Sequence, residues 1–188
     1  MITHSGGAPG VTSRLILLPQ RNAAVFASTN DYIGTATAWA RQVADMIANG
    51  RQDTDFIGKA IADNARTNAE ARTLVDRALE RPAGAAPPSL PLAAYAGTYR
   101  DPWYGVVTVA EKRGKLAIDM SRSELLDGPL LPYEGDVFAA IWPDRTLKAD
   151  AFVTFTVADG KVTGMTMKAI SDITDFSFDF HDLDLKRE

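Results

Sequence analysis

The stretch His4-Ser5-Gly6-Gly7-Ala8-Pro9-Gly10, followed by the apolar run 11–18, gives the first indication of the fold. A second short apolar run covers residues 23–28, and Pro19-Gln20-Arg21-Asn22 between the two runs has the composition of a turn. This arrangement predicts a β-hairpin. Both runs are apolar on successive residues, which is typical of strands covered on both faces.

An isolated hairpin is marginally stable in water, so this one needs a partner. Unpaired strands with two apolar faces are templates for further pairing. We therefore expect the hairpin to pack on its own helix or on a neighbouring molecule, which would make a homo-oligomer.

The next segment predicts a helix over residues 31–49. Asn30 or Asp31 can cap its start, and Asn49-Gly50 can end it, since both residues tolerate the left-handed conformation. Large apolar residues recur at the spacing of one apolar face. They are Trp39, Val43, Met46 and Ile47, extended by Ala36 and Ala40.

A second helix is predicted from a cap at Asp53 or Thr54 to Leu79. Its apolar stripe is thin in the centre, which indicates a partly exposed connecting helix, broken near Thr67-Asn68. Four prolines then fall within residues 81–91 and favour extended chain. We place the domain boundary there, with residues 51–91 as a helical and Pro-rich linker.

Residues 92–188 change to a period of two, the signature of strands with one buried face. Asp159-Gly160 predicts a tight hairpin turn, and Arg113-Gly114 is a weaker case. The pattern predicts an antiparallel meander that closes into a small barrel, with an open sandwich as the alternative. The alternating sets are Leu116/Ile118/Met120, Val153/Phe155/Val157, Met165/Met167/Ala169 and Phe176/Phe178/Phe180. The fold class is therefore α+β: a β-hairpin and two helices, then a barrel.

Composition excludes several functions. The net charge of −4 and the dispersed Lys and Arg residues argue against nucleic-acid binding. No apolar run is long enough to span a bilayer. The chain has no Cys, and two His residues are too few for a His-based zinc site. The Asp residues between 172 and 184 lack the Gly and Glu of a calcium loop, which favours a solvated acidic face.

The segment from His4 to Asn30, with two apolar strands ending in Thr29-Asn30, resembles the C-terminal part of the β-lactamase-related serine hydrolases. This superfamily groups class C β-lactamases, penicillin-binding esterases and D-amino-acid peptidases. Residues 90–188, including Tyr95-Ala-Gly-Thr-Tyr99, look like the lipocalin-like β-barrel appended to many of its members. Residues 1–50 would then be the last strands and helix of an incomplete hydrolase domain.

The resemblance implies roles for the opening motif. The backbone N–H of Gly7 would contribute to an oxyanion hole, His4 would line the cleft, and Ser5 and Gly6 would let substrate approach the strand. The alternative is a frayed terminus with a flexible Gly-Gly tail.

Relatives carry a Ser-x-x-Lys nucleophile and base upstream of this strand, and here no Ser is followed at +3 by Lys. We therefore expect no catalytic residue in this chain, no activity from the chain alone, no cofactor or metal, and an upstream hydrolase domain as its partner. The resemblance points to a bacterial protein and leaves periplasmic, secreted and cytoplasmic locations open.

The barrel has its own candidate residues. Trp103, Tyr104 and Trp142 lie beside prolines and are interpreted either as rim contacts or as half-buried aromatics that close the barrel. His181 is interpreted as a solvated surface residue. Two alternatives to an accessory role are a binding module for a small apolar ligand and a structural oligomerisation piece.

Overall fold

The computed structural model describes residues 1–8, 10–30 and 34–188. The chain forms two compact units, Met1–Ala69 and Glu70–Glu188. The division falls within helix α2, Phe56–Leu79. It therefore precedes the Pro-rich segment in which the sequence predicts a boundary. Among the described residues, no helix combines the length and the apolar character needed to cross a membrane.

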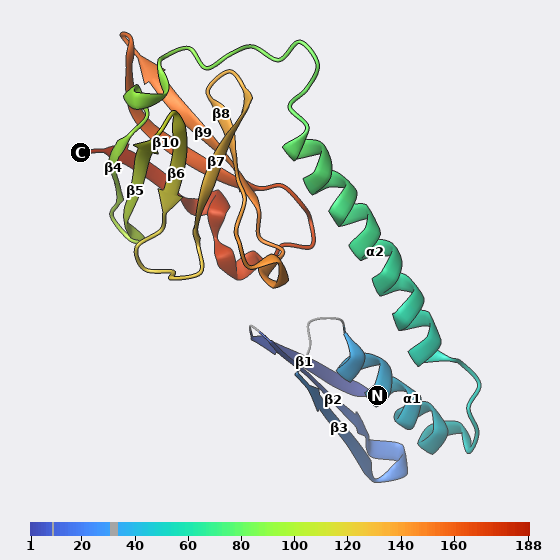
Figure 1. Cartoon of the computed structure of the whole chain (residues 1–188). Coiled ribbons are helices and arrows are strands. Elements are labelled where there is room, and N and C mark those ends of the chain that lie inside the picture. Colours follow the sequence, from blue (N-terminus) through green and yellow to red (C-terminus); the bar gives the residue numbers. More distant parts are fainter. Residues whose placement is uncertain (9, 31–33) are drawn as a thin grey trace. The chain divides into compact units, whose positions relative to one another are not determined.

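The first unit contains a three-stranded antiparallel sheet in the order β1-β2-β3 (Figure 1). Strands β2, Val11–Leu18, and β3, Ala23–Thr29, form the predicted hairpin, with a short 3-10 turn over Pro19–Arg21. Strand β1, Ile2–Ala8, pairs with β2 along its whole length. The opening motif is therefore an ordered edge strand, and the alternative of a frayed terminus is wrong.

Helix α1, Thr35–Asn49, covers one face of this sheet with its small residues. Ala40 and Ala44 pack against Ile16 and Leu18. The predicted apolar face is buried only in part: Ala36 and Ala40 are fully buried, whereas its large residues lie on the exposed side. A row of alanines lets the helix backbone approach the sheet closely, which larger side chains would prevent. The exposed fractions are 52% for Trp39, 36% for Val43, 49% for Met46 and 38% for Ile47.

The predicted start of helix α1 is wrong, whereas its predicted end is confirmed. Its N-terminal cap is Gly34, with φ 75° and no side-chain hydrogen bond, so the cap by Asn30 is wrong; Asp31 lies outside the described residues. The C-terminal end is confirmed: Gly50 is left-handed, and its N–H donates to the carbonyl of Met46 at 2.9 Å.

Helix α2 runs without interruption from Phe56 to Leu79. Its first turn is capped by Asp55, whose carboxylate accepts from the N–H of Gly58 at 2.8 Å, instead of by Asp53 or Thr54. The predicted break near Thr67-Asn68 is absent. The side chain of Asn68 donates to the carbonyl of Asn64, one turn earlier, at 2.9 Å, and so leaves the backbone ladder intact.

The second unit is a closed antiparallel barrel of eight strands, which confirms the predicted fold class and rules out an open sandwich. The order around the barrel is β10-β11-β4-β5-β6-β7-β8-β9, a meander in which the last strand enters beside the first. The strands are β4 Gly97–Asp101, β5 Gly105–Lys112, β6 Lys115–Asp119, β7 Asp127–Glu134, β8 Val137–Ala140, β9 Ala151–Ala158, β10 Lys161–Ala169 and β11 Asp184–Arg187.

Both predicted hairpin turns are confirmed by their backbone conformation. Asp159 and Gly160 have φ of 49° and 71°, and Arg113 and Gly114 have φ of 56° and 74°. Positive φ at both central residues matches the right-handed twist of the flanking strands, which is why these dipeptides specify the turns.

The predicted strand through Phe176, Phe178 and Phe180 is wrong. These residues lie in two 3-10 turns, Phe176–Phe178 and Phe180–Asp182, and the final strand is β11. The carboxylate of Asp175 accepts from the N–H of Ser177 at 2.9 Å, a local bond that competes with strand pairing. The alternation of apolar residues in the sequence gives no information about such local hydrogen bonds.

Aromatic rings fill the centre of the barrel. Tyr95, Tyr99, Phe138 and Phe155 are at most 3% exposed. Phe155 contacts the other three rings edge-on, with centroids 5.0, 5.8 and 5.4 Å away. Edge-to-face packing of this kind adds to the stabilisation from burial.

The Pro-rich segment 81–91 is hydrogen-bonded to the turn between β7 and β8. The N–H of Gly135 donates to the carbonyl of Ala86 at 2.9 Å, and Ser89 donates through both its N–H and its hydroxyl to the carboxylate of Asp136. Tyr95 also donates its hydroxyl to Asp136. The segment is thereby part of the barrel.

Candidate functional site

The opening motif lies on an edge strand, with one side of its backbone unpaired. All seven residues of β1 are exposed. Because β1 has only β2 as a neighbour, about half of its N–H and C=O groups point away from the sheet. Such an edge can hydrogen-bond an extended chain laid beside it.

The residues of the motif alternate between the two faces of the sheet. His4 is in register with Leu15, which pairs with Phe26, and this row lies on the face opposite α1. Ser5 is in register with Arg14, on the face that α1 covers. The structure therefore places His4 and Ser5 on opposite sides of the strand.

The two glycines of the motif have different surroundings. A side chain at Gly6 would meet the hydroxyl of Ser13 at 2.7 Å, whereas one at Gly7 would enter open space. The Ser13 hydroxyl itself donates to the carbonyl of Gly6 at 3.5 Å. Close approach between strands thus accounts for Gly6, while Gly7 leaves the strand surface open.

The structure does not complete a catalytic constellation around this motif. His4 and His181 belong to different units. His181 is exposed and lies 3.5 Å from the carboxylate of Asp182. No cluster of three or more potential metal-ligating side chains occurs in the described part of the chain.

The three aromatic candidates of the barrel have different environments. Trp103 is 86% exposed, on a turn fixed by Asp101, whose carboxylate accepts from the N–H groups of Trp103 and Tyr104 at 2.8 and 2.9 Å. Tyr104 packs partly against the core, and this burial together with the Asp179 carboxylate raises its pKa. Trp142 is 1% exposed, so it closes the barrel and offers no surface contact.

Asp101 also connects strands at this end of the barrel. It accepts a third hydrogen bond from the N–H of Asp184, at 3.1 Å, on the strand next to its own. Burial alone would raise the pKa of Asp101, but the three N–H donors hold it below its ordinary value.

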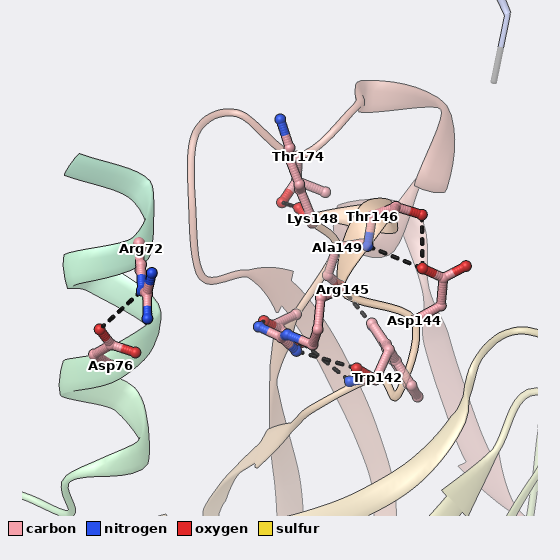
Figure 2. A network of polar contacts seen from close by, with 10 residues as sticks. Arg72, Asp76, Trp142, Asp144, Arg145, Thr146, Lys148, Ala149 and Thr174 are labelled. Carbon is pink, nitrogen blue, oxygen red and sulfur yellow. Dashed lines mark hydrogen bonds and ion pairs between the residues drawn. The ribbon is translucent and has the colours of Figure 1, made fainter. Parts of the chain in front are cut away.

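A polar network that the sequence analysis did not single out lies in the loop between β8 and β9 (Figure 2). The carboxylate of Asp150 accepts two hydrogen bonds from Arg145 and one from the N–H of Trp142, the last at 3.0 Å. The indole N–H of Trp142 donates to the carbonyl of Ala149 at 2.6 Å. The bonds to Asp150 raise the pKa of Arg145. The only signal in the sequence is an Arg and an Asp five residues apart, which is too common to be diagnostic.

These contacts fix the loop, so we assign them to the architecture of the barrel. Thr174 donates its hydroxyl to the carbonyl of Lys148 at 2.8 Å, which joins the loop to the segment before β11. Arg72 and Asp76 of α2, also shown in Figure 2, form an exposed ion pair of 3.8 Å.

The fold and the candidate site define an α+β protein that carries a closed eight-stranded antiparallel barrel after a small strand-and-helix unit. Residues 81–187 match the family described as "Domain of unknown function (DUF3471)", and the chain belongs to this family. The match begins at Arg81, whose guanidinium donates to the carbonyls of Ala85 and Ala86 at 2.9 and 2.7 Å.

Two further comparisons concern the curated proteins and the solved structures. No curated protein matches the chain. A solved structure titled "Crystal structure of SurE" is 17% identical over 99% of this chain, with a TM-score of 0.39. The chain spans 34% of that structure's length.

Proposed function

We propose that this chain is the C-terminal part of a β-lactamase-like serine hydrolase, with the barrel as an accessory domain beside the active site or in assembly. The observation that carries the proposal is the edge strand β1, which presents His4-Ser5-Gly6-Gly7 with one side of its backbone unpaired. A hydrolase that cleaves an ester, amide or β-lactam needs backbone donors at such a position to stabilise the oxyanion.

The open face of the sheet supports the same proposal. Leu15 and Phe26, paired across β2 and β3, are 37% and 68% exposed. Contiguous exposed apolar surface marks an interaction site in folded proteins. An upstream hydrolase domain would cover this face and also supply the Ser-x-x-Lys pair that this chain lacks.

The family match adds a further argument. The matched domain is commonly found at the C-terminus of β-lactamase-related proteins. Here it follows the strand-and-helix unit directly, which is the order that the resemblance implies.

The small-ligand alternative receives less support. The centre of the barrel is occupied by Tyr95, Tyr99, Phe138 and Phe155, whose rings contact one another. A ligand inside the barrel would need a cavity of roughly 300 Å³ or more, which these side chains would have to vacate. We therefore favour the accessory role for the barrel.

The test compares hydrolysis of a nitrophenyl ester and a chromogenic cephalosporin by this chain and by a form extended upstream. We expect no activity from the chain alone and ester hydrolysis from the extended form, abolished when the Ser of its Ser-x-x-Lys is changed to Ala. Activity of the chain alone, or an inactive extended form that is folded, would contradict the proposal.

A matched pair of variants in the extended form tests the role of Gly7. Gly7→Pro removes the backbone N–H, whereas Gly7→Ala keeps it and adds a methyl group in open space. We expect Gly7→Pro to lower kcat by about 100-fold relative to Gly7→Ala. Thermal unfolding of both variants separates loss of the donor from loss of the fold, and equal rates would argue against an oxyanion role.

A further inference from the structure

A pocket of about 490 Å³ lies in the first unit. It is bounded by the end of β2, the turn after it, the second half of α1 and the start of α2. Its apolar lining includes Leu18, Ala44, Ala48 and Phe56. The volume is within the range of roughly 300–1,000 Å³ that small-molecule sites occupy.

The polar groups of this pocket leave a cation available. The carboxylate of Asp45 is engaged, because it accepts from the side chain of Asn49 at 2.7 Å and from the N–H of Asp53 at 3.1 Å. Arg41, one turn before Asp45 on α1, is exposed and has no hydrogen-bond or ion-pair partner in the described ranges. Asp45 keeps its negative charge, but Arg21 and Arg41 both line the pocket, so the net charge of its lining side chains is positive.

A second unpaired donor lies next to the pocket. Gln42 is 5% exposed, and its side-chain oxygen accepts from the N–H of Phe56 at 3.1 Å. Its side-chain nitrogen is buried and has no acceptor among the described residues. A buried donor without an acceptor is unfavourable, but Gln42 does not line the pocket, so the proposal below rests on Arg41.

We infer that this pocket binds an amphipathic anion of the alkyl carboxylate class. The alkyl chain would lie on Leu18, Ala44 and Phe56, and the carboxylate would accept hydrogen bonds from Arg41. Arg21 also lines the pocket, but its guanidinium already donates to the carbonyl of Ala48 at 2.5 Å and holds the end of α1. The inference does not depend on the proposed hydrolase activity.

The experiment titrates the full chain with dodecanoate and follows heat of binding and backbone amide NMR shifts. Two probes serve as controls: dodecyltrimethylammonium has the same alkyl chain with a cationic head, and acetate has the head alone. We expect one saturable dodecanoate site, at least tenfold weaker binding of the ammonium compound and no saturation by acetate. Shifts should centre on Ala44, Ala48 and Phe56.

Three variants test the geometry. Arg41→Ala should weaken dodecanoate binding about tenfold, and Ala48→Leu should weaken it by filling the pocket. Lys59→Ala removes an exposed cation of the same unit that does not line the pocket and should leave binding unchanged. Shifts centred on Phe26 or Trp39, equal binding of the cationic probe, or equal effects of Arg41→Ala and Lys59→Ala would overturn the inference.

Discussion

The guanidinium of Arg145 donates two hydrogen bonds to the carboxylate of Asp150, at 2.7 and 2.6 Å, while the side chain of Asp150 is only 2% exposed. The same carboxylate accepts from the N–H of Trp142. One buried carboxylate therefore organises the loop between β8 and β9. Since the Arg145 side chain is 52% exposed, solvent weakens the pair from the arginine side.

This pair predicts that replacing Asp150 lowers the free energy of unfolding more than replacing Arg145 does. Asp150→Ala should lower the free energy of unfolding by about 2–4 kcal/mol, because Trp142 and Arg145 both lose their acceptor. Arg145→Ala should cost less, about 1–3 kcal/mol, because the N–H of Trp142 still bonds the carboxylate. Urea unfolding measures both values. The control is Lys186→Ala, which removes an exposed pair with Asp184 and should cost below about 1 kcal/mol; equal costs for all three would contradict this account.

The lowered pKa of Asp101 predicts that the folded chain loses stability at acid pH. Its pKa is lowered from 3.8 in the folded state, so its contribution is fully present above the unfolded pKa and disappears as the pH falls through the folded pKa. Asp101→Asn should cost about 1–3 kcal/mol at pH 7. Below about pH 4 the difference between variant and wild type should shrink. Urea unfolding across pH 2.5–7 tests this range, and a difference that stays constant or grows toward acid pH would exclude the assigned role.

The raised pKa of Tyr99 predicts a loss of stability at alkaline pH instead. Burial raises its pKa to about 12, from an ordinary value of 10.0, although Arg187 partly offsets the shift. Its neutral form is thus favoured by folding, and this stabilisation is present below pH 10 and is lost as the pH rises through about 12. In an ultraviolet titration of the folded chain, the Tyr99 tyrosinate should appear at a pH near 12, well above its ordinary value in urea. Tyr99→Phe should remove that step.

Tyr99→Phe also tests a buried hydrogen bond. The Tyr99 hydroxyl donates to the carbonyl of Tyr95 at 2.6 Å, and its loss should cost about 1 kcal/mol at pH 7. Tyr104→Phe is the control, because Tyr104 is only partly buried against the core. It should change the free energy of unfolding by less than Tyr99→Phe does.

The burial of Ala40 beside the exposed Trp39 gives a prediction about packing. Ala40 is fully buried against the sheet, whereas Trp39 beside it is 52% exposed. Ala40→Leu should lower the free energy of unfolding of this chain by about 1–3 kcal/mol through overpacking. Trp39→Ser should change it by less than about 0.5 kcal/mol. A large loss from Trp39→Ser in thermal or urea unfolding would show that the tryptophan face is the packed one in solution.

Local chemistry in the sequence determined the hairpins, most of the barrel strands and the end of α1. A strand with one buried face must alternate, as Val153 and Phe155 do, and a turn such as Asp159-Gly160 needs residues that tolerate positive φ. The motif His4-Ser5-Gly6-Gly7 could likewise be singled out, because its residue types and spacing are local properties.

Only the tertiary structure decided which apolar groups are buried and what pairs with what. Trp39 is the larger apolar residue, yet Ala40 is the one buried against the sheet. The smaller side chain lets the backbone of the helix lie closer to the sheet. The run ending at Phe180 alternates like a strand, but local hydrogen bonds turn it and leave β11 to close the barrel. Tertiary pairing also made the motif an edge strand, with Ser5 on the face that α1 covers. The burial of Ala40 and the position of β11 in the barrel depend on contacts between residues distant in sequence, which no local pattern specifies.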